Sequence, residues 1–210
     1  MMKFVSTFLS ALALAIAATP VAASEEYEAG HTKGSADAPL TIIEYGSLSC
    51  AGCKYFHDEI MPRIESEYID TGKVRFIFRE VLRNDLDTAL VSIARCAGED
   101  NFFPAVDSIF DQQEAILAAA RQGTALEAFI TIGAPYGITD AASFNACYGD
   151  MNIRFDILAV EDSAEAYDLH GTPTLIVNGK EKYVDQDFSS ADTFAAFLDH
   201  QLKAVSVPDN

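Results

Sequence analysis

Two cysteines separated by two residues, Cys50 and Cys53, stand between the pattern of a buried strand and that of an amphipathic helix. The run LTIIEY at residues 40–45 is almost continuously apolar and is interrupted by Glu44. Apolar residues then recur at helical spacing: Phe56, Ile60 and Ile64. The run VRFIF at residues 74–78 has the pattern of a second strand. This order predicts a βαβ unit with parallel strands and a right-handed crossover.

The chain between residues 85 and 169 has a helical pattern throughout, and we expect no strand in it. We call this segment the helical block. Within it, residues 151–167 carry apolar side chains on one side, which predicts a long helix leading out of the block. Before the block, Pro62 predicts a kink or a break in the first helix, because proline lacks an N–H group.

The C-terminal part contains two strand-like runs between Thr174 and Val184. They flank Asn178-Gly179, which is a strong hairpin signal. Ser190 then precedes an amphipathic closing helix. The layout of βαβ, helical block and ββα fits an α/β protein with a thioredoxin-like fold and an inserted helical domain.

Residues 1–23 have the layout of a secretory signal peptide, with Lys3, an uncharged apolar run and small residues before Ser24. The alternative is an uncleaved membrane anchor. The apolar run at residues 4–18 is, however, shorter than the roughly 20 residues that a membrane-spanning helix needs. We therefore expect cleavage after Ala23, followed by export.

The formal net charge of -18 at pH 7 restricts the partners of the protein. Nucleic acids and anionic lipid surfaces bind basic patches, which this sequence lacks, so we expect neither as a partner. Half of the residues are hydrophobic, which is enough to form a buried core. Disulfides persist in exported proteins, and the four cysteines allow three pairings.

The expected position of Cys50 is the start of a helix, where unpaired N–H groups and the helix dipole stabilise a thiolate. A lowered pKa would make Cys50 a nucleophile, and Cys53, one turn further, the resolving thiol. Zinc is an alternative because His57 could join the pair, but a closed site needs four ligands and the other cysteines stand alone. Lys54 after the second cysteine excludes the common form of covalent haem attachment. A purely structural bond across so small a loop would stabilise little.

The stretches EYGSLSCAGC at residues 44–53 and HGTPTLIVNG at residues 170–179, with the helical block between them, resemble the DsbA-like family of periplasmic thiol–disulfide oxidoreductases. The resemblance covers most of the chain after the expected signal peptide. It implies a thioredoxin-like domain in two parts, residues 24–84 and 170–210, with the inserted helical domain at residues 85–169.

By position, the resemblance implies that Cys50 is the family's exposed nucleophile and Cys53 its buried partner. Pro173 corresponds to a cis-proline that lies opposite the cysteine pair. A cis bond would expose the backbone of Thr172 beside the sulfurs. An extended substrate could then pair with that backbone as an added strand.

Glu44 occupies the position at which the family resembled carries a buried acid under the active site. A buried carboxyl is costly unless it is paired or protonated, so we expect a raised pKa and proton transfer with Cys53. The alternative is an ion pair with a basic side chain such as Lys73 or Arg75, which would make Glu44 merely structural.

The dipeptide between the cysteines departs from the family, whose strongly oxidising members carry Pro-His where this chain has Ala51-Gly52. Without a side-chain donor, the pKa of Cys50 should be higher than in a Pro-His enzyme, and the protein a weaker oxidant. Its reduction potential should lie between about -120 and about -270 mV. His57 and His170 are candidates for restoring positive charge, against the alternative that they are packed residues.

The second cysteine pair, Cys96 and Cys147, falls on two helices of the helical block. A bond between them would contribute on the order of 4 kcal/mol to stability by closing a long loop. The resemblance supports this bond, because some DsbA-like relatives carry a second disulfide there. The alternative is a redox relay that modulates the first pair.

These features predict a monomeric periplasmic protein-disulfide oxidase that introduces disulfides into folding proteins through Cys50–Cys53. Its redox-active disulfide serves in place of any other cofactor, and the resemblance implies reoxidation by a DsbB-like membrane partner. Two alternatives stay open. One is a disulfide isomerase or reductase with the same site, and the other is a non-catalytic, disulfide-stabilised binding or chaperone module.

Overall fold

The computed structural model describes residues 29–179, 181–184 and 189–206. The expected signal peptide, residues 1–23, lies outside the described residues. Within the described part of the chain, no helix is both long and apolar enough to cross a membrane.

In the described residues, five strands form one mixed sheet in the order β1-β3-β2-β4-β5. The strands are β1 (His31–Lys33), β2 (Leu40–Gly46), β3 (Val74–Glu80), β4 (Thr174–Val177) and β5 (Glu181–Val184). Strands β2 and β3 are parallel, as the βαβ pattern predicts, and the other neighbours are antiparallel. The predicted hairpin is formed by β4 and β5, with Asn178 and Gly179 both at positive φ between them.

Strand β1 is not predicted by the sequence pattern, in which the first strand starts at Leu40. It is three residues long and polar, and it pairs antiparallel with β3 at the edge of the sheet. Short edge strands with polar or lysine side chains are common, because their pairing comes from the backbone rather than from a buried apolar face. Such a strand leaves no hydrophobic periodicity in the sequence.

The helix predicted after the cysteine pair is a continuous helical segment in which α and π turns alternate. Its parts are α1 (Ala51–Tyr55), η2 (Phe56–Ile60), α2 (Met61–Ile64) and η3 (Glu65–Ile69). Pro62 lies in the first turn of α2, directly after the π turn of η2. The predicted break therefore takes the form of a change of helical type, which accommodates the missing N–H group without ending the helix.

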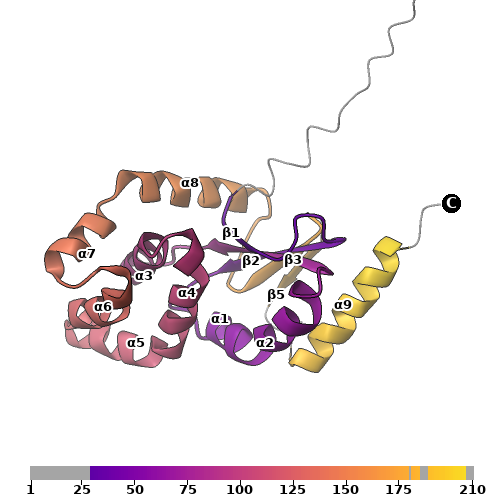
Figure 1. Ribbon diagram of the computed structural model, residues 1–210, viewed down its shortest axis with the longest axis horizontal. Coiled ribbons are helices and arrows are strands. Elements are labelled where there is room, and N and C mark those ends of the chain that lie inside the picture. Colours follow the sequence, from indigo (N-terminus) through magenta and orange to yellow (C-terminus); the bar gives the residue numbers. More distant parts are fainter. Residues whose placement is uncertain (1–28, 180, 185–188, 207–210) are drawn as a thin grey trace, which may run out of the picture.

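The helical block contains helices and no strand among its described residues, as predicted. The helices are α3 (Asp85–Cys96), η4 (Glu99–Asn101), α4 (Phe102–Asp111), α5 (Gln113–Gln122), α6 (Ala125–Gly133), η5 (Ala134–Tyr136), α7 (Ala141–Tyr148) and α8 (Met151–Glu165). The closing helix is α9 (Ala191–Ser206). Helices α3–α7 gather at one end of the sheet, and α9 lies at the other end (Figure 1).

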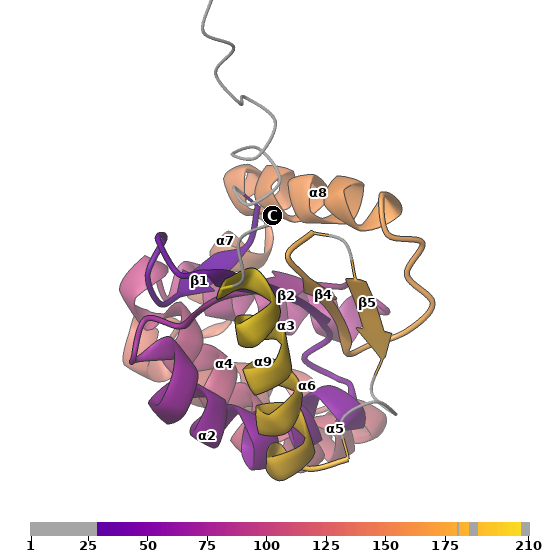
Figure 2. The same ribbon diagram turned by 90° about the vertical axis from the view of Figure 1, so that its right-hand side faces the viewer.

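Helices cover both faces of the sheet (Figures 1 and 2). Alternate residues of β2 belong to different packing clusters, since strand side chains point to opposite faces. Ile42 packs in the large core with the helices after the cysteine pair and with α9. Ile43 and Tyr45 pack with Tyr167 and Leu169, which follow α8. Glu44 therefore points to the face that carries α1, which places its carboxyl under the cysteine pair.

Candidate active site

The cysteine pair lies where β2 leads into α1. Cys50 is the extended residue directly before α1, with φ -91° and ψ 125°, and Cys53 is in the first turn of the helix. Both are free thiols; Cys50 is 8% exposed and Cys53 is fully buried. The sequence therefore places both cysteines correctly relative to the helix, and Cys50 reaches the surface with a small part of its side chain.

The surroundings of Cys50 stabilise its thiolate. Hydrogen bonding from the Cys53 thiol, the largest contribution, lowers the pKa of Cys50 to about 5, and the backbone N–H groups of Cys53 and Gly52 add to this effect. Partial burial acts in the opposite direction. The N–H contribution is the effect expected of a helix N-terminus, where the first amides lack intrahelical partners.

Cys53 has the opposite electrostatic character. Burial raises the pKa of Cys53 well above its usual range, with further increases from the hydrogen bond to Cys50 and from the charge of Glu44. The Ser47 N–H group donates a hydrogen bond to Cys53 Sγ at 3.3 Å and opposes this shift. The two sulfurs therefore differ strongly: Cys50 is stable as an anion and Cys53 as a neutral thiol.

The Thr172–Pro173 loop lies against the cysteine pair, and its peptide bond is cis. Cys50 Sγ is 3.3 Å from the carbonyl oxygen of Thr172 and donates a hydrogen bond to it as a neutral thiol. A Cβ atom on Gly52 would lie 3.2 Å from Pro173 Cδ, closer than most real contacts allow. Glycine at this position thus lets the proline loop approach the start of α1.

Glu44 is fully buried, and its partner is His57. His57 Nε2 lies 3.0 Å from Glu44 Oε2, while Glu44 Oε1 has no hydrogen-bond partner among the described residues. The alternative for Glu44, an ion pair with a basic side chain such as Lys73 or Arg75, therefore finds His57 as the partner and neither of the two named residues. Lys73 Nζ donates to the carbonyl of Glu67 instead, and Arg75 alternates with the β3 residues that face α1.

The His57 ring connects Glu44 with a pocket. Its side chain is 6% exposed, and the ring lies against Phe110 and Phe78, with centroid distances of 4.5 and 5.5 Å. The pocket has a volume of about 370 Å³, and its lining includes His57, Phe110, Asp107 and several other acidic side chains. In the sequence, only the spacing of one helical turn between Cys53 and His57 indicates that His57 lies near the cysteine pair. His170, the other candidate, is 76% exposed and pairs with Asp168.

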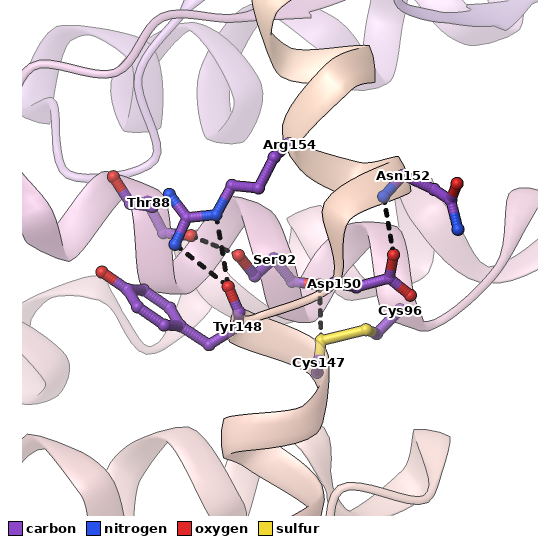
Figure 3. The surroundings of a disulfide bond; sticks show 8 residues. All are labelled: Thr88, Ser92, Cys96, Cys147, Tyr148, Asp150, Asn152 and Arg154. Carbon is purple, nitrogen blue, oxygen red and sulfur yellow. Dashed lines mark hydrogen bonds between the residues drawn. A yellow bond between two sulfur atoms is a disulfide. The ribbon is translucent and has the colours of Figure 1, made fainter.

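The second cysteine pair forms a disulfide between α3 and α7 (Figure 3). The Cα atoms of Cys96 and Cys147 are 6.1 Å apart, and Cys147 Sγ lies 3.0 Å from the carbonyl oxygen of Ser92. The bond thus joins the first and the penultimate α-helix of the helical block. Among the residues that the structure describes, no group of three or more His, Cys, Asp or Glu side chains is arranged to hold a metal ion.

Comparisons with known proteins identify relatives of this chain. A sequence model described as Thioredoxin matches residues 26–200. The "Putative protein-disulfide oxidoreductase" of Rickettsia bellii is 30% identical over 163 residues, which cover 75% of this chain and 61% of that protein. Disulfide bond formation protein D of Bacillus subtilis is 26% identical over 179 residues, which cover 81% of this chain and 76% of that protein. The chain spans about three fifths of the length of the Rickettsia proteins.

Solved structures share the architecture. Alpha-DsbA1 of Wolbachia pipientis superposes with a TM-score of 0.70 at 22% identity, over 87% of this chain and 97% of that chain. BdbD of Bacillus subtilis gives a TM-score of 0.66 at 20% identity, over 83% and 93% of the two chains. These likenesses confirm the predicted fold class, a thioredoxin-like α/β fold with helices inserted in it. The chain therefore belongs to the thioredoxin family and is one of its DsbA-like members.

Proposed function

We propose that this protein is an exported thiol–disulfide oxidoreductase, a dithiol oxidase that introduces disulfides into folding proteins through Cys50–Cys53. The observation that carries the proposal is the difference between the two sulfurs. In the reduced protein Cys50 is stabilised as a thiolate, with a pKa of about 5. Whatever stabilises the reduced form of a dithiol makes its disulfide a stronger oxidant.

The reaction begins with the Cys50–Cys53 disulfide and a substrate thiolate. The thiolate attacks Cys50 Sγ, the bond between the two cysteines breaks, and its electron pair passes to Cys53, which takes up a proton. A second substrate thiolate then attacks the substrate sulfur of the mixed disulfide and releases Cys50 as a thiolate. The substrate loses two electrons and the protein gains them. The raised pKa of Cys53 keeps it protonated after the first step.

The loop at Thr172–Pro173 supports a role in holding the substrate. The Thr172 carbonyl lies next to the attacked sulfur, at 3.3 Å. An extended peptide that pairs with the backbone of Thr172 would present its own cysteine to Cys50. Backbone pairing does not depend on substrate side chains, which suits an enzyme that acts on many folding proteins.

Glu44 is the proposed donor and acceptor for the proton of Cys53. It points to the face of the sheet that carries Cys53, and its charge raises the pKa of that thiol. Its hydrogen bond to His57 holds one carboxyl oxygen, and Oε1 has no hydrogen-bond partner in the part of the chain that the structure describes. The orphan oxygen fits a group that exchanges a proton during the reaction rather than one fixed in a closed ion pair.

The expected partners follow from this chemistry. Substrates are exported proteins with free thiols, and reoxidation of Cys50–Cys53 requires an external oxidant, for which we propose a quinone-linked membrane protein of the DsbB kind. We propose that the protein acts as a monomer in the periplasm after removal of residues 1–23. Mass determination of the mature protein after expression in a bacterium with two membranes tests the cleavage, and fractionation tests the compartment.

The reduction potential of Cys50–Cys53 tests the oxidase assignment. The mature protein is equilibrated with mixtures of reduced and oxidised glutathione, and its thiols are quantified by mass spectrometry. We expect a potential above about -200 mV, in the range of oxidants rather than of thioredoxin. A value near -270 mV would favour a reductase or an isomerase, which use the same residues.

A non-catalytic binding module is the alternative from a different class. Cys50→Ser separates the two functions because it removes the nucleophile and keeps the size of the side chain. The proposed enzyme loses thiol exchange with reduced, unfolded substrate proteins. A binding module would retain its affinity for such proteins and would show no exchange in the unmodified chain either.

A further inference from the structure

The helical block holds the turn before α1 through two buried polar side chains. We call residues 47–50 the cysteine turn. Gln113, the first residue of α5, is 2% exposed, and Asp87, in the first turn of α3, is fully buried. Buried amide and carboxylate groups are costly unless hydrogen bonds satisfy them. Both of these side chains make hydrogen bonds to the cysteine turn, and Asp87 also accepts one from the Arg83 N–H group.

Gln113 binds the carbonyl groups of the turn. Its side-chain nitrogen donates to the carbonyl oxygen of Leu48 at 2.9 Å and to that of Cys50 at 3.1 Å. The two hydrogens of the amide are thus both used. The Cys50 carbonyl also accepts the N–H group of Lys54 at 3.0 Å, which is the first helical bond of α1. Gln113 therefore fixes the carbonyl group at which the helix begins.

Asp87 binds the donor groups of the same turn. Its carboxylate accepts hydrogen bonds from the Ser47 hydroxyl, at 3.0 and 3.1 Å, and from the Ser49 N–H group at 2.9 Å. Ser47 in turn donates its N–H group to Cys53 Sγ. Each residue of the cysteine turn, from Ser47 to Cys50, thus makes a hydrogen bond to a buried side chain of the helical block.

These contacts bear on the sulfur of Cys50 through the backbone. The N–H groups of Gly52 and Cys53 help to stabilise the thiolate, and they belong to the first turn of α1. Hydrogen bonds weaken steeply when the donor turns away from its acceptor. The direction of these N–H groups relative to the sulfur depends on the backbone of Cys50, whose carbonyl is held by Gln113.

We propose that Gln113 is a positioning residue for Cys50, through which the helical block sets the orientation of the first turn of α1 and the stability of the thiolate. Gln113 bonds the Cys50 carbonyl and acts on the sulfur through that carbonyl. The inference rests on the proposed function, since it concerns the reactivity of the same dithiol. It gives the helical block a role in setting the reactivity of the Cys50–Cys53 dithiol.

Gln113→Met tests the inference, because methionine has a similar length and volume and lacks the hydrogen-bond donors. The absorbance of the thiolate against pH gives the pKa of Cys50, and equilibration with glutathione gives the equilibrium constant of the dithiol. We expect the pKa to rise by about one unit and the equilibrium constant for oxidising glutathione to fall about tenfold. The reduced form should lose more thermal stability than the oxidised form.

Gln112→Met is the matched control. Gln112 precedes Gln113 and is part-buried, but its side-chain amide donates to the backbone and hydroxyl oxygens of Ser108 in α4. This variant removes the same amide from the next residue of the chain. We expect the pKa of Cys50 and the equilibrium constant with glutathione to stay at the values of the unmodified protein.

Several outcomes would overturn the inference. A Gln113→Met protein whose two redox states melt equally early, with unchanged pKa and equilibrium constant, would show that Gln113 is merely structural. If this variant does not fold, Gln113→Leu, which also removes the donors and adds no charge, is measured in the same way and must raise the pKa. Failure of the unmodified dithiol to exchange with glutathione would contradict the proposed function instead, while the pKa measurement would still test Gln113.

Discussion

The two cysteine pairs of this protein have the same chemistry available to them and different surroundings. Cys50 and Cys53 are free thiols at the start of a helix, beside backbone N–H groups, a proline loop and a buried carboxyl. Cys96 and Cys147 are joined in a disulfide between two helices of the helical block. The first pair is two residues apart in a loop that a bond hardly constrains, whereas the second pair closes a long loop.

The difference shows that the role of a cysteine pair depends on its position in the fold. A bond that closes a long loop removes conformational freedom from the unfolded chain and therefore acts on stability. A pair at a helix start, with one thiol stabilised as an anion and the other as a neutral group, is suited to exchange. Stability and reactivity should accordingly be separable by mutation.

Removal of Cys53 should have the largest effect on exchange. In Cys53→Ser, the Cys50 thiolate can still attack a disulfide of a substrate protein, which releases one substrate sulfur as a thiolate and leaves a mixed disulfide that no neighbouring thiol resolves. We expect turnover to be lost and mixed disulfides with disulfide-containing, unfolded proteins to accumulate, as seen on non-reducing gels. Cys50→Ser is the control, and it should form no such adduct. Normal turnover by Cys53→Ser would show that the first pair does not act as a dithiol.

Removal of the second pair should act on stability instead. The double substitution of Cys96 and Cys147 by alanine opens a loop of about 52 residues, and the chain-entropy model gives a loss of about 4 kcal/mol in the free energy of unfolding. Denaturant unfolding of the oxidised protein measures this loss. The reduction potential of Cys50–Cys53 should not change. A shifted potential with little loss of stability would favour the alternative of a redox relay between the pairs.

The pH dependence of the reduced protein should distinguish the pairs in a third way. The pKa of Cys50 is about 5 in the folded protein and about 8.5 in an unfolded chain, so folding favours its thiolate. The resulting stabilisation is complete above about pH 8.5, decreases as the pH falls and is lost below about pH 5. Cys53, whose pKa is raised, stays protonated in the folded protein over this window and ionises in the unfolded chain only near its upper end, where its effect opposes that of Cys50.

Melting temperatures of the reduced and oxidised forms, measured across this range, test that expectation. The reduced form should lose stability relative to the oxidised form as the pH is lowered, because the oxidised form has no thiol at Cys50 to protonate. In Cys50→Ser, the stability of the reduced protein should lose the part of its pH dependence that comes from the Cys50 thiolate. A constant difference between the two forms at all pH values would contradict the stabilised thiolate.

The sequence predicts the elements that have a regular apolar face and misses those that do not. Hydrophobic periodicity predicts the βαβ unit, the helical block and the hairpin, because these elements bury regular apolar faces. The spacing of Cys50 and Cys53 at the end of a strand predicts their place at a helix start. Strand β1 has no such face, and its pairing with β3 comes from the backbone, so no periodicity indicates it.

The contacts that complete the site are less accessible to sequence reasoning. Alternation along β2 could have placed Glu44 on the same side as the first helix, and helical spacing places His57 near Cys53, but their bond needs both elements in space. Gln113 and Asp87 come from helices whose apolar patterns say nothing of the cysteine turn. Their partners are 63 and 40 residues away, so only tertiary packing brings them together.

Glu44→Gln should have the smallest effect. The charge of Glu44 raises the pKa of Cys53, but burial is the largest cause of that shift and remains in the variant. We therefore expect the pKa of Cys53 to fall measurably and to stay above its usual range. The rate of Cys53 alkylation against pH, measured in the Cys50→Ser background, reports this value. Glu127→Gln, an exposed acid on α6, is the control and should change nothing. An unchanged Cys53 pKa in Glu44→Gln would remove the electrostatic link between the buried acid and the pair, and with it the proposed proton transfer.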